Sequence, residues 1–444
     1  MNSVLFKIFG LMMTMSLVFG VPASFADEGV PASPASNEVV ALKSKVDELN
    51  QKLADLERKI GNVEGQVREV AKPALEHPGH IVAAPVTEGG LMHVAQDIEM
   101  GGYVDTQYNY NTRQPSTAAG AAAGSTNPLR IFDTDDNSFT VNSAEFYFQK
   151  VAQEAGDAGF RIDIMHGEDA DIVNGDGSGG NKVDLQQAYV EYIAPLSIFE
   201  GNSILPDQVG IKAGRFVTLA GAEVIEGADN WNISRSFGFG LGIPFTHTGV
   251  RTNFGLFNDY FDVYAGVNNG WDTPVDTNAD KTLEAGLGYE PLENVSVFHS
   301  FYFGNENADG VAADHRFLWS NVITWDATDK LSFMGNFDLA NQNIAANARD
   351  STTAQWYEFA AYARYQFNPK FAMAYRAEIF RDETAVRTAG RDTLFAQTFT
   401  AEYKLTESLI ARGEFRHDKA NDDVLIGSSN SSYATLAAQL IYVI

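Results

Sequence analysis

Residues 371–381 read Phe-Ala-Met-Ala-Tyr-Arg-Ala-Glu-Ile-Phe-Arg, and their pattern decides the fold. Phe371 and Tyr375 fall on one face of an extended chain, whereas Arg376 and Glu378 fall on the other. Because side chains point alternately to the two faces of a β-strand, the segment predicts a strand with one apolar and one polar face. The runs on either side of it repeat the pattern.

This period of two continues from residue 98 to the end of the sequence. Ile162 and Ile164 alternate with Arg161 and Asp163 in the same way. The alternating runs predict an all-β chain of about sixteen antiparallel strands, although fourteen or eighteen would also fit. The predicted strands are 98–112, 137–151, 158–168, 182–194, 207–215, 247–257, 260–269, 281–290, 294–304, 314–326, 329–341, 355–367, 370–381, 393–405, 408–418 and 432–444.

The connections between these strands alternate in length. Tight joins, such as Asn258-Asp259 and Asn368-Pro369, take turns with longer polar loops. The predicted long loops are 113–136, 169–181, 216–246, 270–280, 305–313, 342–354, 382–392 and 419–431. Short turns at one end and long loops at the other are typical of a transmembrane barrel in a bacterial outer membrane. A soluble β-sandwich would have shorter strands and less regular loops.

The first 97 residues divide into four predicted segments. Residues 1–26 resemble a signal peptide, with Lys7 before a short apolar run and small residues near Ala26; a retained membrane anchor is the alternative. Residues 27–37 are a flexible leader, residues 38–71 a coiled coil and residues 72–97 a linker. The barrel then takes residues 98–444.

Residues 38–71 carry a heptad pattern whose apolar positions alternate spacings of three and four, which favours self-association. The seam consists of Val39, Leu42, Val46, Leu49, Leu53, Leu56, Ile60, Val63, Val67 and Val70. Branched residues with early leucines suit a dimer, and later valines leave a trimer open. A single helix lying on a surface is the alternative. A barrel on an exported chain would place this segment in the periplasm of a Gram-negative bacterium.

Composition excludes several classes of function. The chain has no cysteine, and its 58 acidic and 31 basic residues give a net charge of −27. Disulfides and thiolate catalysis are therefore excluded, and a nucleic-acid partner, which requires a basic face, is not expected. No nucleophile, base and orienting group stand at a recognisable spacing, so we expect no enzyme. We also predict no cofactor and no metal site.

Charged residues opposite the apolar faces predict a polar interior. A barrel of about sixteen strands is wide enough for a water-filled channel. The candidate pore-lining residues are Arg161, Asp163, Lys212, Arg251, Arg376, Glu378, Arg412, Glu414 and Arg416. For any one of them, an ion pair that braces the wall is an equally good interpretation. The acidic excess would favour cations if it lined the pore, or could instead lie on external loops.

The loop 216–246 differs from the others. It combines Glu223, Glu226, Asp229 and Arg235 with the run Phe237-Gly-Phe-Gly-Leu-Gly. Charges of both signs on a compact apolar support would suit a loop that folds inward and narrows a pore. An ordinary external loop is the alternative.

Residues 214–251 also carry a family resemblance. The stretches Glu223-Val-Ile-Glu, Asp229-Asn-Trp-Asn and Ile243-Pro-Phe-Thr-His-Thr-Gly-Val-Arg, together with Asn268-Asn-Gly-Trp-Asp, are similar to the β-barrel porin-2 (OmpL-like) family. The match is strongest over residues 207–290 and looser elsewhere. The resemblance implies an outer-membrane porin for passive diffusion of small polar solutes or ions, with no particular substrate. One departure is the final Ile444, where many such barrels end in Phe.

Expected partners are outer-membrane lipid and lipopolysaccharide, further copies of the chain through the coiled coil, and the cell wall. A structural role, in which the coiled coil tethers the membrane to the cell wall or a partner, is the main alternative function. Energy-coupled uptake would need a plug domain, which the sequence lacks.

Overall fold

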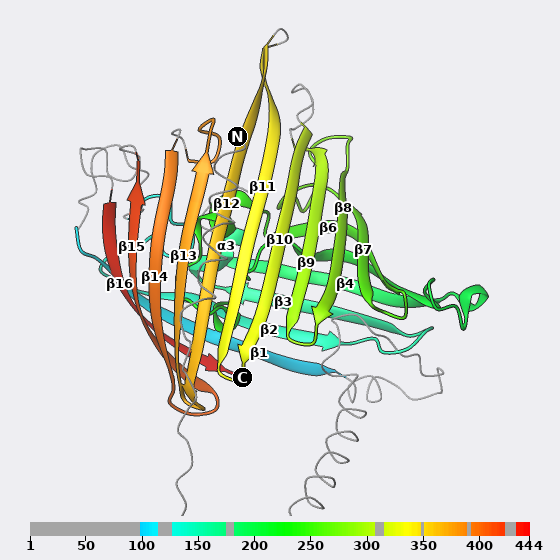
Figure 1. Ribbon diagram of the computed structural model, residues 1–444, viewed down its shortest axis with the longest axis horizontal. Coiled ribbons are helices and arrows are strands. Elements are labelled where there is room, and N and C mark those ends of the chain that lie inside the picture. The colour runs from blue at the N-terminus through cyan, green and yellow to red at the C-terminus, as the bar shows by residue number, and fades with distance from the viewer. Residues whose placement is uncertain are drawn as a thin grey trace, which may run out of the picture. The chain divides into compact units, whose positions relative to one another are not determined.

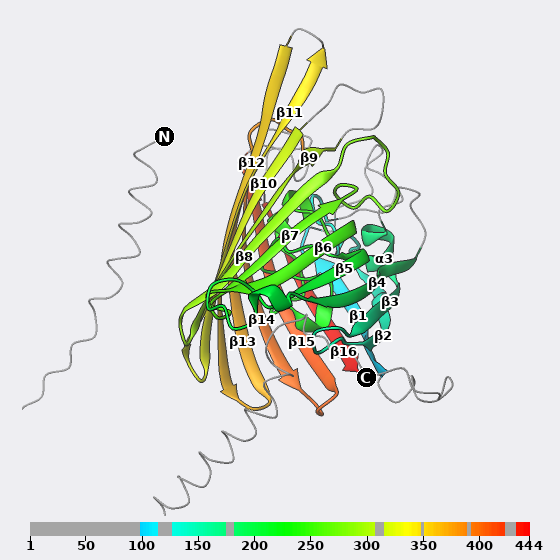
Figure 2. The same ribbon diagram turned by 90° about the vertical axis from the view of Figure 1, so that its right-hand side faces the viewer.

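The structure is a computed structural model and describes residues 98–113, 127–174, 182–306, 315–347, 350–388, 392–421 and 432–444. The predicted signal peptide, leader, coiled coil and linker lie outside the described residues. Within them, sixteen antiparallel strands form one closed barrel (Figures 1 and 2). The predicted fold and strand number of the barrel are confirmed.

Each strand pairs with its neighbours in sequence, and β1 pairs with β16 to close the sheet. The strands are β1 (Glu99–Asn111), β2 (Ser138–Lys150), β3 (Ala158–His166), β4 (Val183–Pro195), β5 (Gln208–Val217), β6 (Thr246–Leu256), β7 (Phe261–Asn268), β8 (Thr282–Leu292), β9 (Val295–Asn305), β10 (His315–Thr328), β11 (Leu331–Asn347), β12 (Asp350–Asn368), β13 (Phe371–Asp382), β14 (Asp392–Lys404), β15 (Leu409–Ala420) and β16 (Ser432–Val443). The register at the closure sets Thr106 opposite Leu440, and the amide of Ile444 donates to the carbonyl of Gly102 at 2.9 Å.

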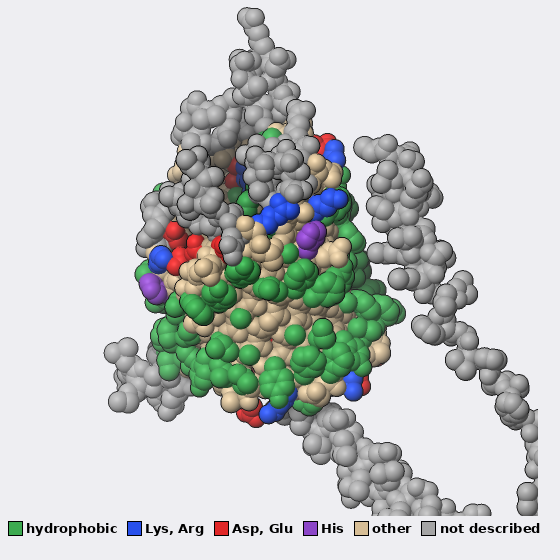
Figure 3. Space-filling model, turned by 90° about the vertical axis from the view of Figure 1, so that its left-hand side faces the viewer, with side chains coloured by type: hydrophobic (Ala, Val, Ile, Leu, Met, Phe, Trp, Pro, Cys, Tyr) green, Lys and Arg blue, Asp and Glu red, His purple; other side chains and the backbone are tan. Residues whose placement is uncertain are grey.

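The outer surface of the barrel is apolar. Ile162, Ile164 and Phe415 are exposed on it, as the alternation predicts. Trp325, Tyr365, Tyr403 and Tyr442 are exposed near the ends of their strands at the short-turn end, where aromatic side chains commonly meet a membrane interface. Figure 3 shows hydrophobic side chains in a band, with charged side chains above and below it. The barrel therefore presents a membrane-facing belt.

Two predicted loops other than 216–246 contain regular structure. The predicted loop 342–354 is largely strand, because β11 continues to Asn347 and β12 starts at Asp350. This hairpin rises beyond its neighbours in Figure 1. The sequence of this hairpin lacks the regular apolar alternation that marks the other strands. The predicted loop 169–181 overlaps a short helix, α3 (Glu168–Val173). None of the helices in the described residues is long and apolar enough to cross a membrane.

Candidate functional site

The β5–β6 connection, residues 218–245, folds into the barrel and is called the inner loop below. It starts against β9 and β10, where the amide of Leu219 donates to the Tyr302 hydroxyl at 2.9 Å and that of Gly221 to Ser320 Oγ at 3.0 Å. It contains two short helical turns, η4 (Gly227–Asp229) and η5 (Gly238–Gly242). The η4 turn contacts β1 and β16, and η5 contacts β11 and β12. The loop therefore crosses the interior.

Carboxylates on β13 and β15 accept hydrogen bonds from backbone N–H groups of the inner loop. Glu414 on β15 accepts the amides of Ile233 and Ser234 at 2.6 and 3.0 Å. Glu378 on β13 accepts the amide of Phe237 at 2.6 Å. Buried amides need such partners, and charged acceptors form the stronger hydrogen bonds. These acidic side chains hold the loop against the wall.

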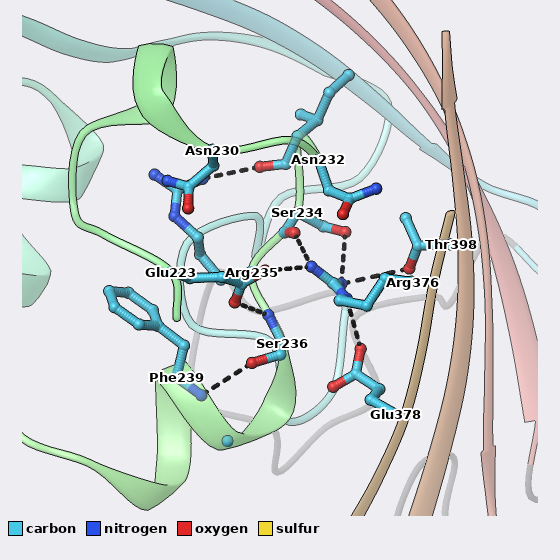
Figure 4. A network of polar contacts seen from close by, with 12 residues as sticks. Glu223, Asn230, Asn232, Ser234, Arg235, Ser236, Phe239, Arg376, Glu378 and Thr398 are labelled. Carbon is cyan, nitrogen blue, oxygen red and sulfur yellow. Dashed lines mark hydrogen bonds and ion pairs between the residues drawn. The ribbon is translucent and has the colours of Figure 1, made fainter. Parts of the chain in front are cut away.

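Arginines of the same wall donate to the loop. Arg376 contacts Glu223 and the carbonyl of Ser234, each at 2.6 Å, and Figure 4 shows it between the loop and Glu378. Arg412 donates to the carbonyl of Gly227 at 2.9 Å. Arg416 donates to the carbonyl of Arg235. Side chains on β13 and β15 thus supply both hydrogen-bond donors and acceptors to a loop that has little regular secondary structure.

A second segment, residues 127–136 of the β1–β2 connection, packs against the inner loop. Its Arg130 pairs with Asp418 of β15 at 2.7 Å, and Asp418 pairs in turn with Arg416 at 2.7 Å. The Phe132 ring lies 5.6 Å from the Phe239 ring. The sequence predicts only a polar loop here. The available signal was the run Leu129-Arg-Ile-Phe, which is mostly apolar within a loop that is otherwise polar or small.

The apolar part of the inner loop forms its support. Ile233, Phe237, Phe239 and Ile243 are buried, and the last three belong to one apolar cluster. The indole of Trp356 on β12 donates to the carbonyl of Gly242 at 3.0 Å. Burial of four large apolar side chains stabilises the loop by roughly 1.5–3 kcal/mol for each of them. The compact apolar support expected from the sequence is present.

The predicted pore-lining residues separate into two groups. Arg376, Glu378, Arg412, Glu414 and Arg416 point into the barrel but are buried beneath the inner loop. These five residues, on β13 and β15, brace the loop. Their contacts match the alternative interpretation, in which such charges are structural.

The remaining four candidates lie on β3, β5 and β6. Arg161 pairs with Asp163 at 2.8 Å, and its side chain is 26% exposed. Lys212 is half-buried, with Nζ 4.1 Å from the centre of the Tyr189 ring. Arg251 is buried beside Glu284, with Nη2 3.0 Å from Oε2. Arg161 and Lys212 are therefore the accessible cations of this set.

The four predicted charges of the inner loop also differ in environment. Glu223 and Arg235 are buried. Arg235 donates to the loop carbonyls of Val224 and Ile233, which makes it part of the loop's framework.

The other two loop charges are more accessible. Glu226 is half-buried and accepts a hydrogen bond from Gln186 at 2.6 Å, and burial raises the pKa of its carboxyl. Asp229 is exposed. Glu226 and Asp229 are thus the loop carboxylates that a solute could meet. The structure places no group of three or more acidic or histidine side chains at a metal-binding distance within its described residues.

Comparison with solved structures finds porins. The chain is similar to the outer membrane channel DcaP of Acinetobacter baumannii (12% identity, TM-score 0.53), with 78% of this chain and 97% of that chain covered. It is also similar to OmpT of Vibrio cholerae in its trimer form (10% identity, TM-score 0.52) and to an anion-selective porin from Comamonas acidovorans (11% identity, TM-score 0.51). Each of these two comparisons covers 78% of this chain and 99% of the other. At such identities the likeness concerns the fold.

A comparison with curated protein sequences gives no match. The family model described as "Putative beta-barrel porin-2, OmpL-like" matches residues 97–444, which is the whole barrel. The chain belongs to this family, and it is an outer-membrane β-barrel channel protein rather than an enzyme.

Proposed function

We propose that the protein is a passive pore through which small polar solutes and ions diffuse along one side of the inner loop. The distribution of accessible charges carries this proposal. On the β12–β16 side, Arg376, Glu378, Arg412, Glu414 and Arg416 are buried under the loop, and the part-exposed Arg364 of β12 pairs with Glu402 at 2.7 Å. On the β3–β5 side, Arg161 and Lys212 retain solvent access, as do Glu226 and Asp229 of the loop.

In this proposal the narrowest part of the path lies between the two accessible cations of the wall and the two accessible carboxylates of the loop. Charges at a narrow, partly desolvated point influence an ion more strongly than the same charges in bulk water. Selectivity would then depend on these four side chains. The protein's large acidic excess would contribute less, because many of its carboxylates are paired or lie outside the path.

Conductance in a planar bilayer tests the pore directly. Purified, folded protein should give openings whose conductance rises with salt concentration. A bilayer that shows no openings with folded protein inserted would contradict the proposal.

The reversal potential in a salt gradient then tests which charges line the path. K212E should shift the preference toward cations, and D229N should shift it toward anions.

The matched control is K419E, which makes the same change of charge at an exposed outward position on β15. It should leave the reversal potential unchanged. If K419E and K212E shift the reversal potential equally, the charges act through the general surface potential, and the proposed path is wrong.

We further propose that the protein contacts outer-membrane lipid and lipopolysaccharide, and that residues 38–71 join copies of the chain in the periplasm. The strict heptad seam supports self-association. A tethering role for the same segment, toward the cell wall or a partner, is compatible with a pore. Removal of the segment tests the tethering role. The barrel should then lose its attachment to the cell wall or the partner, while its conductance stays unchanged.

A further inference from the structure

Glycine is concentrated on the inner face of four neighbouring strands, β5 to β8. Side chains alternate between the two faces of a strand, so residues an even number of positions apart share a face. By this count, every glycine of these strands shares the inner face with an inward side chain of its own strand, namely Lys212, Arg251, Asn268 or Glu284. The glycines, called the glycine floor below, are Gly210, Gly214, Gly249, Gly255, Gly266, Gly286 and Gly288.

The strands that carry the inner loop differ from this pattern. The described strands β10 to β16 contain two glycines, Gly335 and Gly413, and both fall on the outer face. On β13, the inner-face residues from Ala372 to Asp382 are all buried. On β5 and β7, by contrast, Lys212 and Tyr264 are only half-buried. Water therefore reaches the inner wall at the glycine floor, on the side that the inner loop leaves open.

Neighbouring side chains occupy the space that a side chain at these glycines would take. A Cβ at Gly210 would lie 2.3 Å from Asn253 Oδ1, and one at Gly266 would lie 2.6 Å from Glu284 Oε1. Asn253 and Glu284 stand directly opposite these two glycines on the next strand. Opposite Cβ atoms are normally about 4.5–5.5 Å apart, so both side chains lean across the glycine beside them. They lie along the wall and leave the interior wider.

Phe298 of β9 extends across two glycines of β8. Its Cζ is 3.1 Å from the position of a Cβ at Gly286, and its Cδ2 is 3.2 Å from that of a Cβ at Gly288. Tyr264 and Leu219 approach the same position at Gly286 to 3.1 and 3.2 Å. The Tyr264 and Phe298 rings meet edge to face, with their centres 5.7 Å apart. Side chains of β7, β9 and the inner loop therefore converge at Gly286.

We propose that the glycine floor sets the largest solute that the pore admits, and that Gly286 is the position at which this limit is most sensitive. The proposal rests on the function proposed above, because it requires that solutes cross on the side that the inner loop leaves open. The diameter and the lining of a pore decide which solutes pass. On β13 and β15 the inner loop fills the interior, whereas on β5 to β8 the absence of side chains keeps it open. A side chain added to the floor would enter the path or push its neighbour into it.

Liposome swelling with a series of neutral sugars from arabinose to raffinose tests this proposal on the full chain. The size limit is the sugar size at which the rate of entry falls to half of the arabinose rate. Gly286→Leu places a branched side chain where Phe298, Tyr264 and Leu219 meet, so the size limit should shift to smaller sugars. Neutral sugars separate this effect from the charges of the path.

Gly335→Leu is the matched control. It makes the same substitution at an outer-face glycine, where a Cβ meets nothing within 4 Å, and should keep the size limit of the wild type. A second variant tests the cause of the shift. Adding Phe298→Ala to Gly286→Leu removes the ring that the new side chain displaces, so the size limit should move back toward that of the wild type.

An unchanged size limit in Gly286→Leu, with normal entry of arabinose, would overturn this inference and leave the pore intact. An equal shift in Gly335→Leu would also overturn it, because the effect would then come from a general distortion of the barrel. Folded wild type that admits no arabinose would contradict the pore itself. If Gly286→Leu does not fold, Gly286→Ala demands smaller movements of the neighbours at 3.1 and 3.2 Å and should shift the size limit in the same direction.

Discussion

Gly238 lies so close to Glu358 that a Cβ at position 238 would overlap the carboxylate, and its amide donates to Glu358 Oε1 at 3.1 Å. The loop backbone at Gly238 therefore contacts a side chain of β12 directly. A side chain at position 238 would force the buried Glu358 carboxylate, which binds this amide, to move.

Gly238→Ala should displace η5 from the wall. Overpacking of this kind costs about 1–3 kcal/mol, so the midpoint of heat unfolding should fall. Single-channel conductance should rise as the loop moves. Gly335→Ala is the control, because a Cβ at that position meets nothing within 4 Å. Equal conductance in the two variants would show that η5 does not limit the path.

Arg376→Met should destabilise the protein strongly. The Arg376 side chain is fully buried and pairs with Glu223 and Glu378, so its removal leaves the buried Glu223 without its cation and leaves Glu378 with Arg416 alone, at 3.4 Å. Such losses cost about 3–5 kcal/mol. Arg381→Met breaks the exposed pair with Glu383 and should cost about 0–1 kcal/mol. Adding Glu223→Gln to Arg376→Met should restore part of the stability. The unfolding free energies of the wild type, Arg376→Met, Glu223→Gln and the double variant measure this coupling.

Asp272 should make stability depend on pH. Its carboxylate accepts the amides of Phe245 and Thr246 at 2.7 and 2.9 Å, and burial raises its pKa to about 6. The pKa in the unfolded chain is about 3.9. The folded state therefore binds the proton more tightly, and this stabilisation is complete below about pH 4 and is lost as the pH rises through about 6.

The comparison with Asp272→Asn isolates this effect. The unfolding midpoint of the wild type minus that of the variant should decrease between pH 4 and pH 7. The exposed Glu200→Gln provides a control, and its difference from the wild type should be smaller over that range. A flat difference for Asp272→Asn would contradict the prediction.

Removal of residues 38–71 should leave the conductance of one barrel unchanged and abolish the oligomer. The heptad seam predicts that association depends on its apolar positions. Light scattering in detergent measures the mass of the complex. In the full chain, Leu49→Asp with Leu53→Asp should have the same effect. Persistence of the oligomer in both proteins would place the contact in the barrel.

The barrel could be predicted because its signal is local. Alternation of the kind seen at Ile162 and Ile164 needs only the pleat of the strand, and the strands repeat it with one exception. The exception is the β11–β12 hairpin beyond Gln342, whose sequence does not alternate regularly between apolar and polar residues. Where a strand extends beyond the membrane it needs no apolar face, so the sequence pattern that predicts a strand is missing there.

The inner loop could be predicted only in part. Its composition indicated inward folding, but its contacts depend on which side chains stand opposite across the closed sheet. Glu358, Asp418 and Arg130 were missed for this reason. No spacing in the sequence links Arg130 to Asp418, which lie 288 positions apart. The prediction located the charged wall residues and could not separate those that bind the loop from those that remain accessible.

The seam between β1 and β16 has a consequence for the order of events during assembly. Thr106 and Leu440, which face each other across it, are 334 positions apart. No other strand pair of the described barrel is so distant in sequence, since the rest are successive hairpins. The hairpins can form one after another while the sheet is still open. During this time the backbone N–H and C=O groups at the free edge of β1 have no partner strand. Closure comes last, and until then that edge is where a neighbouring chain, or an assembly factor that offers a strand, would pair.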